Sequence, residues 1–81
     1  MIPQVIFAEH REKYQIFIRF SDGKEGVIDF KEDLYGEVFE EIKDLNRFMD
    51  FSIHPDFHTI CWQSGADFAP EYLYERLLKL N

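Results

Sequence analysis

Hydrophobic and polar residues alternate along the first third of the chain. The hydrophobic residues at positions 14, 16, 18 and 20 are separated by Gln15, Phe17 and Arg19, and this period of two predicts a half-buried strand. Runs at residues 5–9 and 24–30 predict a strand on either side of it. Since polar residues at 10–13 and 21–23 separate the runs, we predict a three-stranded antiparallel meander.

The turn at residues 21–23 sets the register of the second and third strands. A two-residue loop would place Ile16 opposite Asp29, whereas a three-residue loop with Gly23 in a left-handed conformation places Ile16 opposite Ile28. We predict the three-residue loop, because a slip of one residue would turn every side chain to the other face. One apolar face then holds Tyr14, Ile16, Ile18, Ile28 and Phe30, and the other holds Phe17, Val27 and the pair Arg19–Glu25.

The second half changes to short segments of different kinds. Residues 37–43 predict a short helix with Val38, Phe39 and Ile42 inward, and Asp44 is a predicted N-cap for a helical turn at 45–49. Residues 51–54 and 58–62 predict a hairpin. Pro70 suits the first turn of a final helix, and the stripe along that helix is Leu73, Leu77 and Leu80. Turns are expected at all four glycines, Gly23, Gly26, Gly36 and Gly65.

These elements predict a single α+β domain over residues 1–81. It has a small antiparallel sheet, made of the N-terminal meander plus a C-terminal hairpin, packed with short central helices and a C-terminal helix. A chain of 81 residues forms a thin core. Aromatic residues make up 17% of the chain, more than a thin core can easily hold, so we expect some rings at the surface. A cluster of exposed rings usually marks a surface that binds a partner.

Charge is unevenly distributed. The net charge is −7, and residues 21–50 hold ten acids against four Lys and Arg. Phosphate backbones repel such a surface, so we expect no direct binding of nucleic acid. A basic protein partner would be attracted to it. The alternative is a solvated acidic face that only aids solubility.

Candidate chemistry is sparse. His54 and His58 are four apart, but Pro55 between them argues against a helix, and Cys61 would face away from His58 on a strand. We therefore expect no metal site, and with neither a phosphate-binding loop nor a nucleophile in a catalytic context we expect no cofactor and no enzymatic activity. Asp67 is predicted to cap the final helix or to tie the strand end to it, with a role as a contact residue beside Trp62 as the alternative.

Location is predicted from what the chain lacks. The start has no basic region and only a short apolar run, and no stretch is long enough to span a bilayer. A single cysteine allows no internal disulfide and fits a reducing compartment. We expect a cytoplasmic protein that does not associate with membranes.

Two stretches together resemble one bacterial family, domain of unknown function 2442. They are Phe20-Ser21-Asp22-Gly23-Lys24-Glu25-Gly26 and Trp62-Gln63-Ser64-Gly65-Ala66-Asp67-Phe68-Ala69-Pro70 with Leu73-Tyr74, and the similarity spans Ile2 to Leu77. The resemblance implies a small α+β fold, a bacterial cytosolic protein and no assigned catalytic residues. Leu45 and Gln63 stand where the family often has Pro.

The same resemblance implies a partner. Members of the family occur alone or fused to a helix-turn-helix DNA-binding domain, and genes of stand-alone members often neighbour those of another short family, as in toxin–antitoxin pairs. We expect no fused DNA-binding segment after residue 81, so the fused function is not transferred to this chain.

We therefore favour a binding module for a protein partner, in an antitoxin-like role beside a neighbouring small protein. One alternative is a structural homodimer formed through the strand edges or the Phe17 and Val27 face. The other is a small-ligand binder or enzyme with a site near Trp62 and Asp67. The candidate partner-binding or motif residues are Asp22, Gly23, Glu37, Glu40, Glu41, Trp62 and Asp67.

Overall fold

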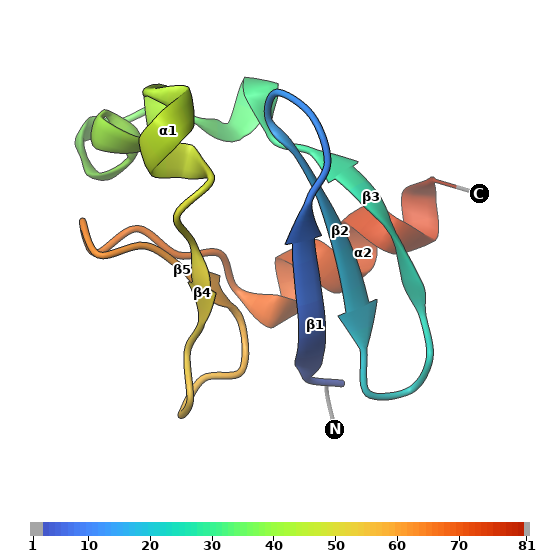
Figure 1. Ribbon diagram of the computed structural model, residues 1–81. Coiled ribbons are helices and arrows are strands. Elements are labelled where there is room, and N and C mark those ends of the chain that lie inside the picture. The colour runs from blue at the N-terminus through green and yellow to red at the C-terminus, as the bar shows by residue number, and fades with distance from the viewer. Residues whose placement is uncertain (1–2, 81) are drawn as a thin grey trace.

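The fold is a three-stranded antiparallel sheet flanked by a hairpin, short helices and a C-terminal helix (Figure 1). A computed structural model describes residues 3–80. The ends of the predicted domain, Met1, Ile2 and Asn81, lie outside the described residues, and so does Ile2 as the first residue of the resemblance. The sheet has the order β1-β2-β3, and β4 pairs with β5. The strands are β1 (Val5–His10), β2 (Gln15–Phe20), β3 (Glu25–Asp29), β4 (Ser52–Ile53) and β5 (Ile60–Cys61). The predicted α+β class is confirmed.

The helices occupy two places around the sheet. Helix α2 (Pro70–Lys79) crosses the back of the sheet as seen in Figure 1, and three shorter helices lie at its upper end. These shorter helices are η2 (Glu37–Phe39), η3 (Glu41–Lys43) and α1 (Leu45–Phe48), preceded by η1 (Lys31–Asp33). The β4–β5 hairpin lies beside β1, to which it is joined by a hydrogen bond of 3.0 Å from the Val5 amide to the His58 carbonyl.

The register of the β2–β3 hairpin is the one that the sequence predicts. Ile16 lies opposite Ile28 and Arg19 opposite Glu25, and the Arg19 Nε donates to the Glu25 carboxylate at 2.7 Å. Gly23 has φ of +93°, in the left-handed region that a side chain disfavours. The predicted three-residue loop is therefore confirmed.

Gly26 is the exception among the glycines, because it lies within β3 opposite Ile18 and not at a turn. A Cβ atom at this position would lie 3.1 Å from the Leu77 Cδ2 atom of α2. The missing side chain allows the helix to pack closely against the strand. Leu73 and Leu77 are buried in this interface, whereas Leu80, the third member of the predicted stripe, is exposed.

The predicted helix at residues 37–43 is wrong in type. The segment forms two 3₁₀ turns, η2 and η3, joined at Glu40, and Val38 is exposed. Phe39 and Ile42 are the residues that reach the core, and their spacing of three matches the three residues per turn of a 3₁₀ helix. Crowding of Glu37, Glu40 and Glu41 on so short a segment also disfavours an α-helix, because like charges three and four apart repel.

Aromatic side chains fill the centre of the core. Phe48 of α1 is fully buried, and its ring lies 5.1 Å from the ring of Tyr14, 5.6 Å from Trp62 and 6.3 Å from both His10 and Phe30. The helix that carries Phe48 is held by the predicted N-cap, since the Asp44 Oδ1 accepts from the Asn46 amide at 3.0 Å. Phe48 thus joins the short helices, the sheet and the turn after β5 into one core.

Candidate functional site

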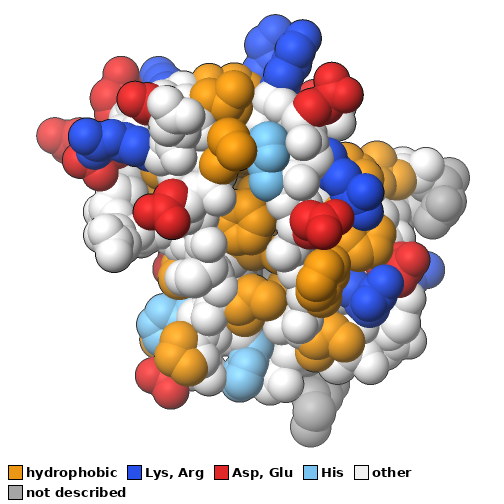
Figure 2. Space-filling view, viewed as in Figure 1, with side chains coloured by type: hydrophobic (Ala, Val, Ile, Leu, Met, Phe, Trp, Pro, Cys, Tyr) orange, Lys and Arg blue, Asp and Glu red, His pale blue; other side chains and the backbone are white. Residues whose placement is uncertain are grey.

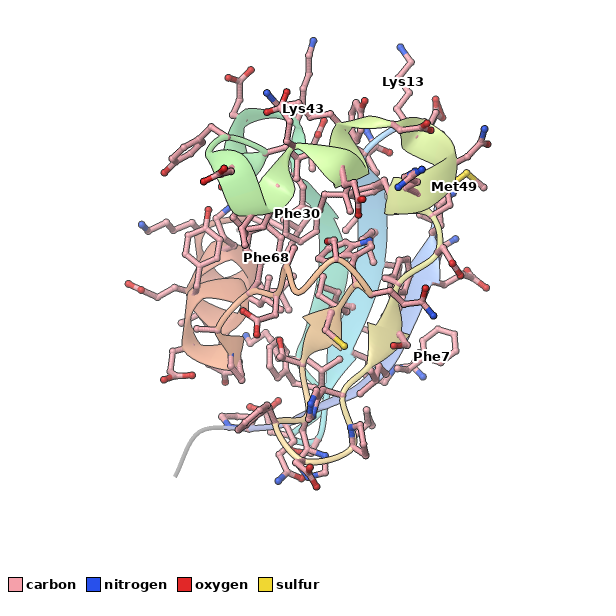
Figure 3. All side chains as sticks on the ribbon, turned by 90° about the vertical axis from the view of Figure 1, so that its left-hand side faces the viewer. Phe7, Lys13, Phe30, Lys43, Met49 and Phe68 are labelled. Carbon is pink, nitrogen blue, oxygen red and sulfur yellow. The ribbon has the colours of Figure 1, made fainter. Side chains whose placement is uncertain are left out.

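Carboxylates line two adjoining depressions on one side of the molecule. We call this surface the acidic side; it comprises η2, η3, α1 and the turn at residues 62–66, and Figure 3 looks onto it. The first depression has a volume of about 280 Å³ and lies between α1 and Trp62. The second is a wider, shallower groove between η2 and the same turn. Together they are lined by Glu37, Val38, Glu40, Glu41, Ile42, Asn46, Arg47, Asp50, Trp62, Gln63 and Ser64.

The charges in these depressions are mostly negative. Four acids line them against one base, Arg47, whose Nη1 lies 3.1 Å from the Glu41 Oε1. Glu40 pairs with Lys43 at 3.2 Å. Within residues 3–80, Glu37 and Asp50 have no salt-bridge partner within 4.0 Å, so their charges remain uncompensated. The groove therefore presents a negative, solvent-exposed surface.

The structure brings together four of the seven candidate residues. Glu37, Glu40 and Glu41 line the second depression, and Trp62 borders the first beside Glu41. Trp62 itself is only 5% exposed, and its indole Nε1 donates to the Phe48 carbonyl at 2.8 Å. Its main contacts are therefore those of a core residue, with one edge at the depression.

Asp22 and Gly23 lie at the opposite end of the molecule, in the β2–β3 turn (Figure 1). The Asp22 carboxylate accepts from the Lys24 amide at 2.9 Å and from the Tyr74 hydroxyl at 2.6 Å. The hydrogen bond from Tyr74 lowers the pKa of Asp22, and the same bond raises the pKa of Tyr74. Asp22 thus ties the hairpin turn to α2, and the long-range partner Tyr74 carries no signal in the sequence.

Asp67 does not cap α2, so the capping prediction is wrong. The N-cap position is Ala69, no side chain caps the helix, and Asp67 instead pairs with Cys61 through the backbone. With Pro70 in the first turn there is one amide fewer to cap. Asp67 is exposed and lines a third depression of about 260 Å³, together with Asp33, Tyr35, Phe39, Phe68, Ala69 and Tyr72. Trp62 and Asp67, which the small-ligand alternative places in one site, thus border different depressions.

A polar network beside this third depression was not predicted. The Arg76 Nη1 donates to the Asp33 Oδ2 at 2.7 Å and to the Tyr72 hydroxyl at 2.9 Å, and its Nη2 donates to the Asp29 carbonyl at 2.8 Å. The Tyr72 hydroxyl also donates to the Asp33 carboxylate. Tyr72 and Arg76 are four apart on a predicted helix, but nothing in the sequence links them to Asp33.

Burial and these hydrogen bonds shift two titrations in the network. Burial raises the pKa of Tyr72, and the hydrogen bond to Asp33 raises it further, so the phenol stays protonated. Burial alone would lower the pKa of Arg76, but its hydrogen bonds to Asp33 and Tyr72 outweigh that effect and the pKa is raised. The network therefore holds a charged guanidinium against a neutral ring.

His10, His54 and Cys61 take part in local contacts. The His54 Nδ1 accepts from the amides of Asp56 at 3.0 Å and Phe57 at 3.2 Å, which shapes the turn between β4 and β5. Among residues 3–80, no three His, Cys, Asp or Glu side chains are grouped so as to hold a metal ion. Of the helices in the same range, none combines the length and the apolar character needed to cross a membrane.

Comparison with known proteins identifies the family. Neither the curated proteins nor the solved structures contain a match to this chain. A family model described as a protein of unknown function (DUF2442) matches residues 5–78, which is nearly the whole chain. The resemblance carried by the two stretches in the sequence is thereby confirmed, and the chain belongs to the DUF2442 family.

Proposed function

We propose that this chain is a protein-binding module and that its acidic side receives a basic segment of a partner protein. The observation that carries this proposal is the lining of the two adjoining depressions, in which four acids face one base that is already paired with Glu41. Opposite charge would steer such a partner to this side and orient it there. The same charge would disfavour acidic partners and nucleic acids.

The shape of the surface suits an extended segment of a partner. The second depression is a shallow groove, and the first continues it towards α1. Val38 is exposed beside the acids and offers an apolar contact at the rim. Such a surface can bind a partner without the converging, desolvated ionisable groups that a reaction centre requires.

The family resemblance suggests which partner to test first. Gene pairs of the toxin–antitoxin kind make the product of a neighbouring short gene the first candidate, and we propose an antitoxin-like role for the chain in the cytoplasm. We also propose a non-enzymatic role for the chain, because the acidic side, within residues 3–80, lacks the converging, desolvated ionisable groups that a reaction centre requires.

The test is a comparison of two charge-matched double variants. The partner is recovered with the tagged chain from its native host, identified by mass spectrometry, purified and titrated by calorimetry at low and high salt. Each rim charge contributes roughly 0.2–1 kcal/mol, so we expect Glu37→Gln with Glu40→Gln to weaken binding by about fivefold. The matched control is Glu12→Gln with Glu75→Gln, two exposed acids outside these depressions. An equal loss of affinity for the partner in both double variants, or a Kd that does not change with salt, would contradict the proposal.

A second candidate function is self-association through the outer face of the sheet. Phe7 is 41% exposed and points away from α2 (Figure 3), and its ring meets that of Phe17 edge to face at 6.0 Å. Arg19, paired with Glu25, lies 5.5 Å from each ring. Figure 2 shows a broken band of hydrophobic side chains across this face, with charges of both signs beside it.

Balanced charge is what favours a second copy on this face. Two copies of a protein with net charge −7 repel each other, but the paired charges at Arg19 and Glu25 make this face locally neutral. If the face forms a dimer, light scattering should give twice the mass of the chain at high concentration, and Phe7→Gln should restore the monomer. A monomer at every concentration would exclude this candidate.

A further inference from the structure

The third depression has aromatic rings along one side. Phe39 and Phe68 stack with centroids 5.2 Å apart at 27°, and Phe68 and Tyr72 stack with centroids 5.9 Å apart at 17°. Figure 3 shows Phe68 below the short helices and next to α2. Tyr35, which is 74% exposed, borders the same depression. Four rings therefore line a space of about 260 Å³, which is smaller than most small-molecule sites and comparable with one large side chain.

The charge of this depression is set by Asp67. Two acids line it, Asp33 and Asp67, and no Lys or Arg does. Asp33 is neutralised by Arg76 at 2.7 Å. Within residues 3–80, the Asp67 carboxylate has neither a salt bridge nor a hydrogen bond, although it lies at the edge of an aromatic surface. A negative charge beside ring faces attracts a cation, because the ring faces are themselves negative.

The protein already holds one guanidinium in this manner. The Arg76 guanidinium lies 5.7 Å from the centroid of the Tyr72 ring and pairs with Asp33. The tyrosine, through its ring and its hydroxyl, and the carboxylate thus bind a planar cation at one end of the row Phe39–Phe68–Tyr72. Tyr35 and Asp67 supply the same two groups in the depression, without a cation of the protein's own among the described residues.

We propose that this depression, which we call the Tyr35–Asp67 pocket, binds an arginine side chain of the protein partner. The guanidinium stacks on the exposed ring and donates to the Asp67 carboxylate. Arginine fits better than lysine because its planar group stacks on rings and donates two parallel hydrogen bonds to a carboxylate. This inference rests on the proposed function and extends it, since Phe39 of η2 lines this pocket while Glu37 and Val38 of the same turn line the acidic groove.

The first test needs no knowledge of the partner. The tripeptide acetyl-Gly-Arg-Gly-amide is titrated into the ¹⁵N-labelled full chain, with the citrulline analogue, which has the same shape and no charge, as the matched ligand. We expect saturable chemical-shift changes at Tyr35, Asp67 and Tyr72, with the arginine peptide binding at least about fivefold more tightly than the citrulline peptide. No saturable change, equal binding of both peptides, or changes confined to Glu37, Glu40 and Glu41 would overturn the inference.

Variants then assign the effect to the pocket. Asp67→Asn and Tyr35→Ser alter exposed side chains and should each weaken the arginine peptide by at least about fivefold, whereas Asp56→Asn, at the turn between β4 and β5, should leave its affinity unchanged. Unchanged melting temperatures confirm that the variants fold, and undiminished binding in Asp67→Asn would overturn the inference. The two proposals fail separately. If binding of the partner depends on Glu37 and Glu40 but not on Asp67, the proposed function stands and the pocket inference fails. If the arginine peptide binds but no protein partner is found, the pocket inference stands and the proposed function fails.

Discussion

Replacing Phe48 with alanine should lower the free energy of unfolding by about 3–5 kcal/mol. Phe48 is fully buried and its ring contacts those of His10, Tyr14, Phe30 and Trp62, so its loss leaves a cavity among large rings that cannot close without moving several elements. Urea denaturation followed by circular dichroism measures the change. Domains of this size have only roughly 5–15 kcal/mol of stability, so we expect the variant to be partly unfolded at physiological temperature.

The matched control for Phe48→Ala is Phe57→Ala. Phe57 is 66% exposed at the turn between β4 and β5, and changes at exposed positions alter stability by about 0.5 kcal/mol or less. If Phe48→Ala leaves no folded protein to measure, Phe48→Leu, which retains most of the buried volume, should still unfold at lower urea than the unmodified chain. Equal effects at positions 48 and 57 would show that Phe48 is not the residue that joins the short helices to the core.

Replacing Arg76 with leucine should cost about 2 kcal/mol. Removing one partner of a fully buried ion pair costs roughly 3–5 kcal/mol, and this pair is only partly buried, with side chains 15% exposed at Asp33 and 28% at Arg76. The variant leaves the Asp33 carboxylate without its counter-ion and the Asp29 carbonyl without its donor. Thermal and urea denaturation of the single variant provide the measurement.

A double-mutant cycle separates the pair from its surroundings. Adding Asp33→Asn to Arg76→Leu removes the uncompensated charge, so the double variant should be more stable than the sum of the two single effects by about 1 kcal/mol. Additive effects would mean that solvent screens the pair completely, and that packing and the Tyr72–Asp33 hydrogen bond hold α2 to η1. Leu78→Ala, an exposed position on the same helix, serves as the control for changes in helix propensity.

The part of the fold that could be predicted is the part fixed by neighbours in sequence. The three-residue turn at Gly23 determines which residues of β2 and β3 face each other, and the choice between Ile28 and Asp29 as the partner of Ile16 decided the register. The cap at Asp44 is likewise a contact between residues two apart. Local geometry and binary pattern are sufficient for such features.

Features that depend on distant residues could not be predicted. The segment at residues 37–43 reads as a helix by its apolar spacing, but its type follows from how Phe39 and Ile42 meet the core. The sequence predicts a turn at Gly26, whereas the structure shows that a glycine is needed there because α2 packs closely against it. The hydrogen bond that joins Asp33 to Arg76 crosses 43 positions of the chain, so no pattern within either segment could reveal it.

The candidate surface was predicted in part for the same reason. Residues 21–50 carry the excess of acids, but the fold divides them: Asp22, Glu25 and Asp29 belong to the β2–β3 hairpin and its end, and Glu37, Glu40 and Glu41 to the short helices (Figure 1). Negative charge that is continuous in sequence is therefore not continuous in space. The pocket at Tyr35 and Asp67 joins segments 32 positions apart, and only the structure reveals it.

The position of the single tryptophan has a practical consequence. Trp62 is packed against Phe48 in the interior, yet one edge of it borders the depression beside Glu41. Its intrinsic fluorescence should shift to the red when the domain unfolds, because the indole then meets water. Occupation of the depression should instead change the emission while the ring stays in place. One native chromophore can therefore report both processes without any attached label.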